Sequence, residues 1–373
     1  MIYLDYCANM PASEHVLDAF LKAEREYPGN ANSHHTAGRA ADKAIEDARV
    51  QTASMLGVKP SEIIYTSGAT ESNNMAVRGM AASMRHVGRH IISTALEHSS
   101  VSASLSRLQA EGYEIDLCPM GRNGRIDLEE LENLIRKDTC IVSVSAVDPE
   151  LGVIQPLHEI AELLKKYPDI RLHVDASQAF GRIPVDFAIG DTISLAPHKF
   201  GGINGIGLLI KKDGVSMEPL LTGGASTTPY RPGTPTTALI LSTVPALEDA
   251  LACREEGFAS VKQLNTLFRE LLKDVDAVRF NSPEDAIPYI LNLGVKGIRG
   301  IRMQELLDEA GICVSVKSAC ASDLLPSKAV YTVYRDKKRS YESFRISFSR
   351  ETTEEEIRTA ADVIRHIVES ENA

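Results

Sequence analysis

The chain has 373 residues, of which 43% are hydrophobic and 24% are charged. This length and composition are typical of a soluble globular protein with two domains and a large core. The formal net charge of −11 argues against a surface that binds nucleic acid. Because no apolar run is long enough to span a membrane and residues 1–5 lack the layout of a signal peptide, we expect a cytoplasmic protein.

The six cysteines are scattered along the chain, and none forms a CxxC pair. This spacing disfavours a zinc site or a disulfide framework, so we expect no metal centre. Most of the cysteines are expected to be small buried hydrophobes, and at most one is expected to be chemically active. They are Cys7, Cys118, Cys140, Cys253, Cys313 and Cys320.

Between residues 60 and 210, β-rich runs alternate with stretches that have helical patterns. Such alternation is typical of a mostly parallel sheet with helices on both faces. The expected strands are 63–66, 90–94, 141–147, 172–175, 192–196 and 207–210, and the expected helices between them are 72–84, 128–136 and 157–166.

After residue 236 the pattern changes, and a long helical segment is followed by short strands mixed with helices. This change predicts a second, smaller α+β domain. The expected helices are 236–274, 301–310 and 353–369, and the expected strands are 278–281, 289–293, 313–316 and 344–348.

Residues 66–74 (Thr-Ser-Gly-Ala-Thr-Glu-Ser-Asn-Asn) follow an expected strand and open an expected helix. Small residues let a ligand approach the backbone, and the amides of a helix start can bind phosphate together with the Thr70 hydroxyl. An ordinary N-cap by Thr70 or Ser67 explains the same residues equally well. His98 ends the next strand, where it could stack on a cofactor ring or move protons, although a histidine satisfied in the core is commoner.

Asp175 ends a predicted buried strand and Lys199 follows another, at the sheet edge where ligands bind in α/β proteins. The Asp175 carboxylate needs a partner, which is either a protonated pyridine nitrogen or a set of backbone amides or an arginine. Burial lowers the pKa of a lysine and favours the neutral amine that reacts with pyridoxal phosphate. The alternative for Lys199 is a lysine that caps the strand and reaches solvent.

Two further residues are candidates for chemistry near the C-terminus. Cys320 lies in a small, polar stretch (Ser-Ala-Cys-Ala-Ser-Asp), which is the setting of an accessible thiol, although a loop cysteine without a role fits as well. Arg345 lies inside an apolar strand pattern, and a buried guanidinium needs an anion. That anion is either a substrate carboxylate or the acid of a structural salt bridge.

In their order and spacing, these segments resemble the group I cysteine desulfurases of the NifS/IscS type, which belong to aminotransferase class V. The resemblance runs from residues 2–5 through 66–74, Asp175 and Lys199 to Cys320 and residues 345–357. It implies an α/β chain of the pyridoxal phosphate-dependent transferase fold type I. A mostly parallel sheet would form a large domain (12–250), and a smaller α+β domain (1–11 and 251–373) would carry the cysteine loop and the substrate arginine.

The resemblance also implies a role for each matching residue. Lys199 would bind pyridoxal phosphate covalently and later move the α-proton of the substrate. Cys320 would attack the sulfur of L-cysteine, which leaves a persulfide on the enzyme and releases alanine, while Arg345 binds the substrate carboxylate. The other implied cofactor contacts are Asp175 with the pyridine nitrogen, His98 stacked on the ring, Gln178 with the phenolate oxygen, and Ala69, Thr70, His198 and (from the neighbouring subunit) Thr234 with the phosphate.

The resemblance further implies a homodimer that passes its sulfur to an acceptor protein, such as an iron–sulfur scaffold or a thiolation protein. Neither a nucleic acid nor a membrane is an expected partner.

The chain departs from the family pattern near the expected site. Asp148-Pro149 stands where the family has two asparagines, Ala196-Pro197 replaces Ser-Gly, and residues 226–228 replace polar and charged residues. Proline lacks an amide donor, so one hydrogen bond to cofactor or substrate is lost. These changes leave two alternatives open: another pyridoxal phosphate reaction, such as β-lysis or transamination, and a non-catalytic interaction protein, against which Lys199 argues.

Overall fold

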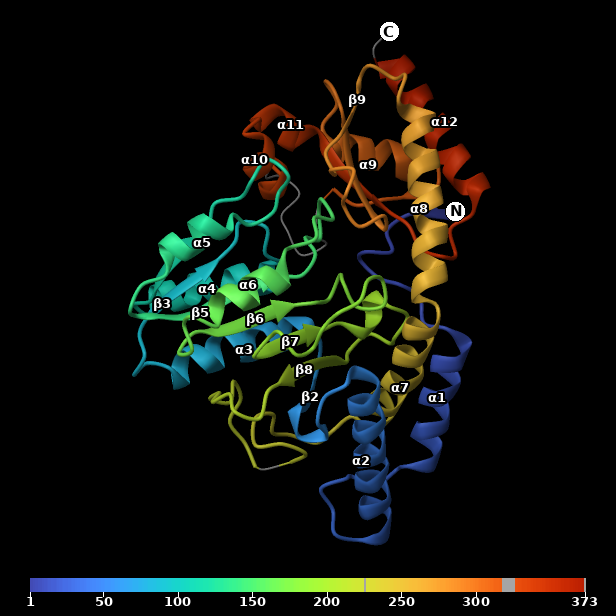
Figure 1. Cartoon of the computed structure of the whole chain (residues 1–373). Helices are drawn as coiled ribbons and strands as arrows, with labels where there is room; N and C mark the ends of the chain where they lie inside the picture. Colours follow the sequence, from blue (N-terminus) through green and yellow to red (C-terminus); the bar gives the residue numbers. More distant parts are fainter. Residues whose placement is uncertain (225, 317–325, 372–373) are drawn as a thin grey trace.

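A seven-stranded sheet forms the centre of the larger part of the computed structural model, which describes residues 1–224, 226–316 and 326–371 (Figure 1). Its strand order is β2-β8-β7-β6-β5-β3-β4, and every strand except the antiparallel β8 points the same way. The strands are β2 (Ile63–Thr66), β3 (His90–Ser93), β4 (Glu114–Leu117), β5 (Thr139–Ser145), β6 (Arg171–Asp175), β7 (Thr192–Leu195) and β8 (Gly207–Lys211).

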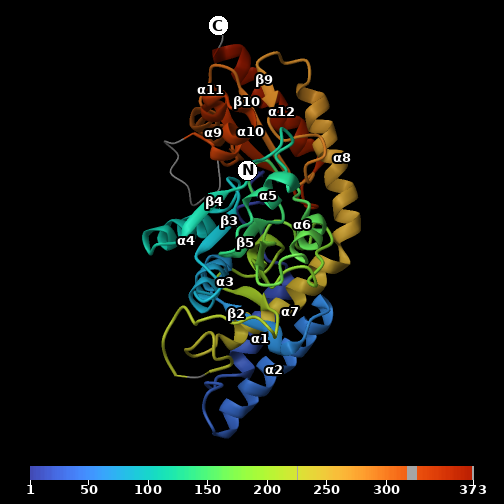
Figure 2. The same ribbon diagram turned by 60° about the vertical axis from the view of Figure 1, so that its left-hand side comes forward.

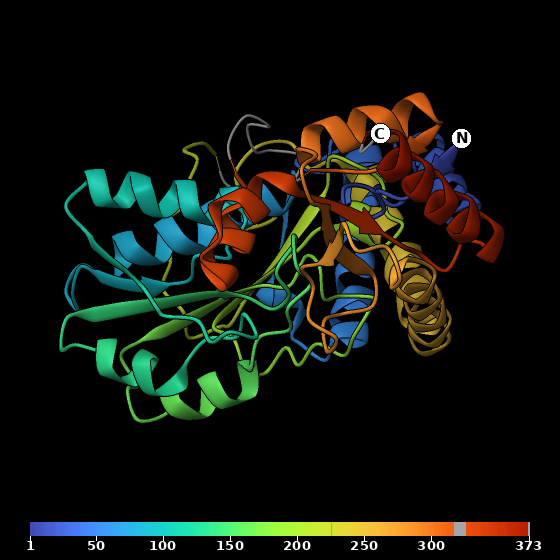
Figure 3. The same ribbon diagram turned by 90° about the horizontal axis from the view of Figure 1, so that it is seen from above.

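Helices cover both faces of this sheet. Seen from above, α3 (Ala69–Ser83) and α4 (Ser99–Ala110) lie on one face, and α5 (Leu128–Leu134) and α6 (Leu157–Leu164) lie on the other (Figure 3). All seven residues of the inner strand β5 are buried, as expected for a parallel strand with helices above and below it. The expected α/β fold with a mostly parallel sheet is therefore confirmed.

Three further helices pack together beside the β2 edge of the sheet. Helices α1 (Glu14–Glu26) and α2 (Thr36–Leu56) contact α7 (Thr237–Ala252), and α8 (Arg254–Leu272) continues from α7 toward the C-terminal part (Figure 2). The expected helical segment 236–274 consists of two helices, because the helix breaks at Cys253. No helix among the described residues is both long and apolar enough to cross a membrane.

The C-terminal part contains a three-stranded antiparallel sheet, in the order β12-β10-β9. The N-terminus joins this part, because β1 (Ile2–Tyr3) pairs with β11 (Ile312–Cys313) and Asp5 bridges to Ser347. Strand β11 replaces the strand expected at 313–316, and it is two residues long. The remaining elements are β9 (Val278–Phe280), β10 (Ile290–Val295), α9 (Gly300–Glu309), α10 (Lys328–Tyr334), α11 (Lys337–Glu342), β12 (Ser343–Ser347), α12 (Glu354–Glu371) and the 3-10 helices η1 (Pro60–Glu62) and η2 (Pro197–Lys199).

Candidate active site

A cavity of about 310 Å³ opens where the parallel strands of the large sheet end. The segments that follow β2, β3, β5, β6 and β7 all contribute to its wall, as expected for a ligand site at the carboxyl edge of an α/β sheet. The N-terminal segment and β12 close its far side through Cys7 and Arg345. Residues from both ends of the chain therefore share one cavity with residues of the sheet.

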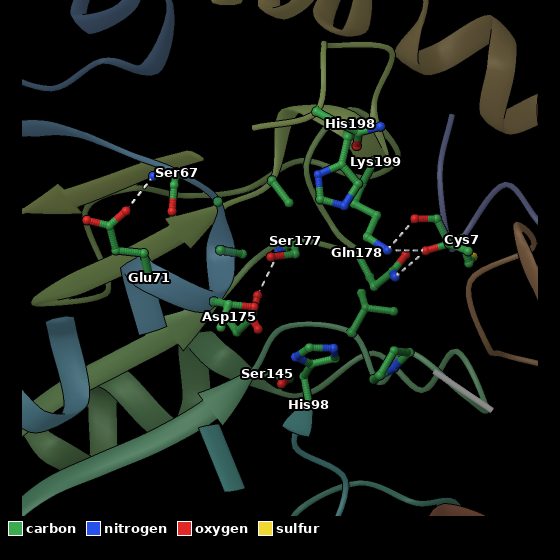
Figure 4. Close-up of a pocket in the computed structure, with 18 of the residues that line it drawn as sticks. Cys7, Ser67, Glu71, His98, Ser145, Asp175, Ser177, Gln178, His198 and Lys199 are labelled. Carbon is green, nitrogen blue, oxygen red and sulfur yellow. Dashed lines mark hydrogen bonds between the residues drawn. The ribbon is translucent and has the colours of Figure 1, made fainter. Parts of the chain in front are cut away.

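Lys199 lies at the end of η2, directly after β7, and lines the cavity. Its Nζ donates hydrogen bonds to the carbonyl oxygens of Cys7 at 2.5 Å and Ala8 at 2.9 Å (Figure 4). Burial, helped by the nearby Arg345 charge, lowers the pKa of Lys199 from 10.5 to about 8. The side chain turns into the cavity instead of reaching solvent. At neutral pH a larger fraction of its amine is uncharged than in an ordinary lysine.

Asp175 is the last residue of β6 and is buried at the cavity wall. Its Oδ2 accepts a hydrogen bond from Asn73 Nδ2 at 2.8 Å, and its Oδ1 accepts one from the backbone N–H of Ser177 at 3.0 Å (Figure 4). The buried Ser177 Oγ has no partner among the described residues. An acidic group and an orphaned hydroxyl thus face the same cavity, which suits a ligand with a cationic nitrogen and a second polar group.

The start of α3 forms another wall of the cavity. The helix begins at Ala69, its N-cap is Gly68 at φ +155°, and no side chain caps it. The interpretation of Thr70 or Ser67 as an ordinary N-cap is therefore wrong, since Thr70 is the second residue of the helix. A helix start without a capping side chain leaves backbone amide donors for an anion. The space beside Gly68 is open, because a Cβ added to this residue would meet no atom within 4 Å.

Two histidines line the cavity as neutral rings. Burial lowers the pKa of His98, and it lowers the pKa of His198 to about 4 with help from the Lys199 charge. His98 caps α4, because its Nδ1 accepts the backbone N–H of Ser100 at 3.2 Å. His198 can therefore offer a hydrogen bond to a bound anion at neutral pH, but no positive charge.

Arg345 is almost completely buried in β12 and already has an acidic partner. Its Nη2 donates to Asp5 Oδ1 at 2.8 Å, and its Nη1 donates to the carbonyl oxygen of Pro149 at 2.8 Å. Its buried Nε has no partner in the described part of the chain. The structure thus contains the salt bridge that the sequence left open as an alternative, and the same guanidinium also lines the cavity.

The Gln178 amide lines the cavity but is engaged within the protein. Its Nε2 donates to the carbonyl oxygen of Cys7 at 3.1 Å, and its Oε1 accepts from Arg182 Nη1 at 2.5 Å. One amide hydrogen of Gln178 remains for a cofactor oxygen.

One expected site residue, Cys320, is outside the described residues, and another, Thr234, lies elsewhere. Thr234 lines a separate hollow beside Asn30, and its Oγ1 is 3.5 Å from Asn30 Nδ2. Within its own chain, Thr234 is therefore not part of the wall of the Lys199 cavity.

The sequence did not single out Asp5, Cys7, Asn73 or Ser177 as contributors to the site. Ser177 had a local signal, because it lies between Asp175 and Gln178, and Asn73 lies within the segment 66–74. Asp5, Cys7 and Asn73 enter through contacts between segments that are far apart in the sequence.

Comparisons with known proteins agree with this geometry. A family model described as aminotransferase class-V matches residues 2–359. The chain belongs to the aminotransferase class-V family. It is 35% identical over 373 residues to "Cysteine desulfurase IscS" of Dictyoglomus turgidum, which covers 99% of this chain and 94% of that protein. It is also 35% identical to "Putative cysteine desulfurase IscS 1" of Bacillus subtilis, with 98% of both chains covered.

Solved structures of the family have the same fold. A structure titled "NIFS-LIKE PROTEIN" matches with a TM-score of 0.92 and 32% identity over 99% of both chains. Another, titled "SspA in complex with cysteine", matches with a TM-score of 0.82 and 28% identity, covering 95% of this chain and all of that chain. The expected likeness to the NifS/IscS group is confirmed.

Aminotransferase class-V proteins of this group depend on pyridoxal phosphate, and the cavity fits that cofactor. It combines a lysine of lowered pKa, a buried carboxylate, an uncapped helix start and an orphaned hydroxyl. The lysine suits the aldehyde of the cofactor, and the carboxylate suits its pyridine nitrogen. The helix start suits the phosphate, and the hydroxyl suits a polar ring substituent.

Proposed function

We propose that this chain is a pyridoxal phosphate-dependent cysteine desulfurase that converts L-cysteine to L-alanine and leaves a persulfide on Cys320. The observation that carries this proposal is the buried Lys199 amine, which shares one cavity with Asp175 and Arg345. The choice of L-cysteine as the substrate is supported by the relatives named as cysteine desulfurases, which align with almost the whole chain.

Lys199 and Asp175 are the groups that prepare the cofactor. When bound, pyridoxal phosphate supplies an electron sink that makes the α-carbon of an amino acid acidic. Lys199 would hold it through Nζ, and the same neutral nitrogen would move the α-proton of the substrate. Asp175 would favour a positive charge on the ring nitrogen, since a buried carboxylate stabilises a cation next to it. His98 would lie against the ring.

The phosphate would be held by groups that surround the start of α3. Ala69 and Thr70 would supply backbone amides and a hydroxyl, and His198 would supply a neutral donor. Thr234, which lines a different hollow in its own copy, would reach this phosphate from a second copy of the chain. We therefore propose a homodimer in which each copy completes the site of the other.

Arg345 and Cys320 act on the substrate. Arg345 orients the substrate carboxylate with guanidinium hydrogens that Asp5 and Pro149 leave available. The Cys320 thiolate attacks the substrate sulfur, the carbon–sulfur bond breaks, and the carbon receives a proton. Alanine leaves, and the sulfur stays on Cys320 as a persulfide. An acceptor protein in the cytoplasm, such as an iron–sulfur scaffold or a thiolation protein, then takes this sulfur.

One observation favours a second candidate, which is another pyridoxal phosphate reaction on a related amino acid, such as β-lysis or transamination. Pro149, whose backbone carbonyl oxygen accepts a hydrogen bond from Arg345 Nη1, has no side-chain amide, whereas the family has an asparagine at this position. A substrate next to Arg345 would therefore lack one hydrogen-bonding group, which could change the preferred substrate. A panel of amino acids separates the candidates, because turnover of another substrate without turnover of cysteine favours the second.

The direct test is mass spectrometry of the intact protein after incubation with L-cysteine, combined with measurement of alanine. The wild-type protein should gain one sulfur atom on Cys320 and release alanine. The variant Cys320→Ala should gain no sulfur at this position and lose most alanine release, whereas Cys313→Ala, a cysteine in β11, should behave like wild type. Alanine release by Cys320→Ala at the wild-type rate would falsify the mechanism.

A further inference from the structure

Asn73 lies behind the cavity wall, on the second turn of α3, and is fully buried. Its Nδ2 donates to two acceptors, Asp175 Oδ2 at 2.8 Å and Ser100 Oγ at 2.9 Å. Its Oδ1 bonds to His173 Nε2 at 3.1 Å. One amide group therefore contacts the residue proposed to pair with the cofactor nitrogen and also the first turn of α4.

The surroundings leave one orientation for this amide. An ionised carboxylate only accepts hydrogen bonds, so the side of Asn73 that faces Asp175 must be the NH₂ group. The amide oxygen then faces His173, and the His173 ring must carry its proton on Nε2 to donate to it. Burial lowers the pKa of His173 to about 4, which keeps that ring neutral. The Nδ1 of His173 bonds to the Thr192 hydroxyl at 3.0 Å, so both ring nitrogens are satisfied.

The second Asn73 donor sets the direction of the next hydrogen bond. Because the Ser100 hydroxyl accepts from Asn73, its own proton is free to point to His98 Nδ1, at 2.8 Å. The backbone N–H of Ser100 donates to the same Nδ1 at 3.2 Å. Two donors at Nδ1 make it an acceptor, so the neutral His98 ring carries its proton on Nε2.

We infer that Asn73 is a positioning residue that holds Asp175 with one hydrogen of its amide and, through the Ser100 hydroxyl, holds His98 with the other. The hydrogen-bond path stands on the geometry alone, while its consequence for catalysis rests on the proposed function. In that function, a fixed Nε2–H on His98 makes this ring a donor and leaves Lys199 as the group that accepts the substrate proton. Asn73 thus couples Asp175 and His98, two residues that would contact the cofactor ring.

The His98 branch can be measured by NMR without an activity assay. The full-length chain is labelled with ¹⁵N-histidine and recorded with and without cofactor, and His98 is assigned from the spectrum of His98→Gln. Wild-type His98 should show a protonated Nε2 and a hydrogen-bonded Nδ1. In Ser100→Ala and Asn73→Ala, the Nδ1 resonance should move toward that of a nitrogen without a hydrogen bond, and it should move further in Ser100→Ala.

The matched control is Ser104→Ala, which removes another buried hydroxyl of α4. Ser104 Oγ donates to the backbone carbonyl of Ser100 and not to its hydroxyl. Its removal should leave the His98 resonances at their wild-type positions. If Asn73→Ala does not fold, Asn73→Ser takes its place, because a serine hydroxyl is too short to reach Asp175 and Ser100 together.

The Asp175 branch is read from the rate at which cofactor dissociates. Asn73→Ala removes a hydrogen bond to a buried carboxylate and should raise this rate about tenfold. Ser100→Ala keeps both bonds of Asp175 and should raise it much less. The inference is overturned if His98 keeps its wild-type resonances in Asn73→Ala, or if the two variants release cofactor equally fast. Failure of cysteine turnover with these NMR shifts intact would count against the proposed function and not against this path.

Discussion

The Arg345 guanidinium is bound to the Asp5 carboxylate at 2.8 Å, across 340 positions of the sequence. Both groups are withdrawn from solvent, with 1% of the Arg345 side chain and 17% of the Asp5 side chain exposed. The pair keeps a cation inside the cavity before any substrate arrives. It also means that an incoming carboxylate must share its arginine with Asp5.

Replacing Asp5, the partner of Arg345, should change the stability of the protein and its affinity for the substrate in opposite directions. We expect Asp5→Asn to lower the free energy of unfolding by about 3 kcal/mol, because a buried cation loses its counter-ion. The same variant should bind the carboxylate of alanine, the product of the proposed reaction, more tightly. Thermal unfolding with and without alanine measures both effects, and the exposed Asp18→Asn is the control. A smaller ligand-induced stabilisation in Asp5→Asn than in wild type contradicts the proposed role of Arg345.

Lys199 should make cofactor uptake depend on pH. Only the neutral amine reacts with the aldehyde, and burial lowers the pKa of Lys199 to about 8. The rate at which cofactor-free protein takes up pyridoxal phosphate should fall about tenfold for each pH unit below 8 and level off above it. The absorbance of the lysine-bound cofactor follows the reaction. A profile that keeps rising to pH 10 shows that the amine titrates as an ordinary lysine.

Asp148 should reduce stability in a defined pH window. Burial, with the Glu150 charge as a second cause, raises the pKa of Asp148 from 3.8 to about 7. An acid with a raised pKa in the folded state keeps its proton there, so stability falls as pH rises from about 4 to 7. Asp148→Asn removes this loss and keeps an acceptor for the Leu151 N–H.

The stability gained by Asp148→Asn should therefore grow from near zero at pH 4 to a plateau above pH 7, on the order of a few kcal/mol. Urea unfolding at a series of pH values measures it. The exposed Asp42→Asn should show no comparable trend. A gain that is the same at every pH means that Asp148 is not a titrating buried acid.

The start of α3 should dominate cofactor retention. Ala196-Pro197 supplies no hydroxyl where the family has a serine, so we expect the phosphate to depend on Thr70 and on Thr234 of a second copy. Thr70→Ala should increase cofactor loss during dialysis about tenfold, which corresponds to one hydrogen bond to a charged group. Ser83→Ala, at the other end of α3, is the control. Unchanged retention in Thr70→Ala would refute this assignment.

The sequence alone predicted the elements whose signal is local. Strands such as β5 and β7 are rich in apolar residues because helices cover both faces of the sheet, and Asp175 and Lys199 lie at or just after the ends of such buried strands. Strand β4 escaped prediction because it is an edge strand with half-exposed residues and no apolar run. Helix α4 escaped because its serine-rich sequence has little helix propensity. The division into domains at residues 11 and 250, and the roles of Cys320 and Thr234, stay predictions.

The tertiary structure decided what surrounds those residues. Asp5 and Cys7 come from the N-terminal segment, and only the fold shows that they contact Arg345 and Lys199. Asn73 belongs to the segment 66–74 that the sequence singled out, but nothing in the sequence separates it from its neighbour Asn74, which is the same residue type. The difference between them is that Asn73 faces the interior, toward Asp175. Hydrophobic patterns specify which segments become buried strands and helices, whereas hydrogen bonds across the cavity depend on how those segments pack.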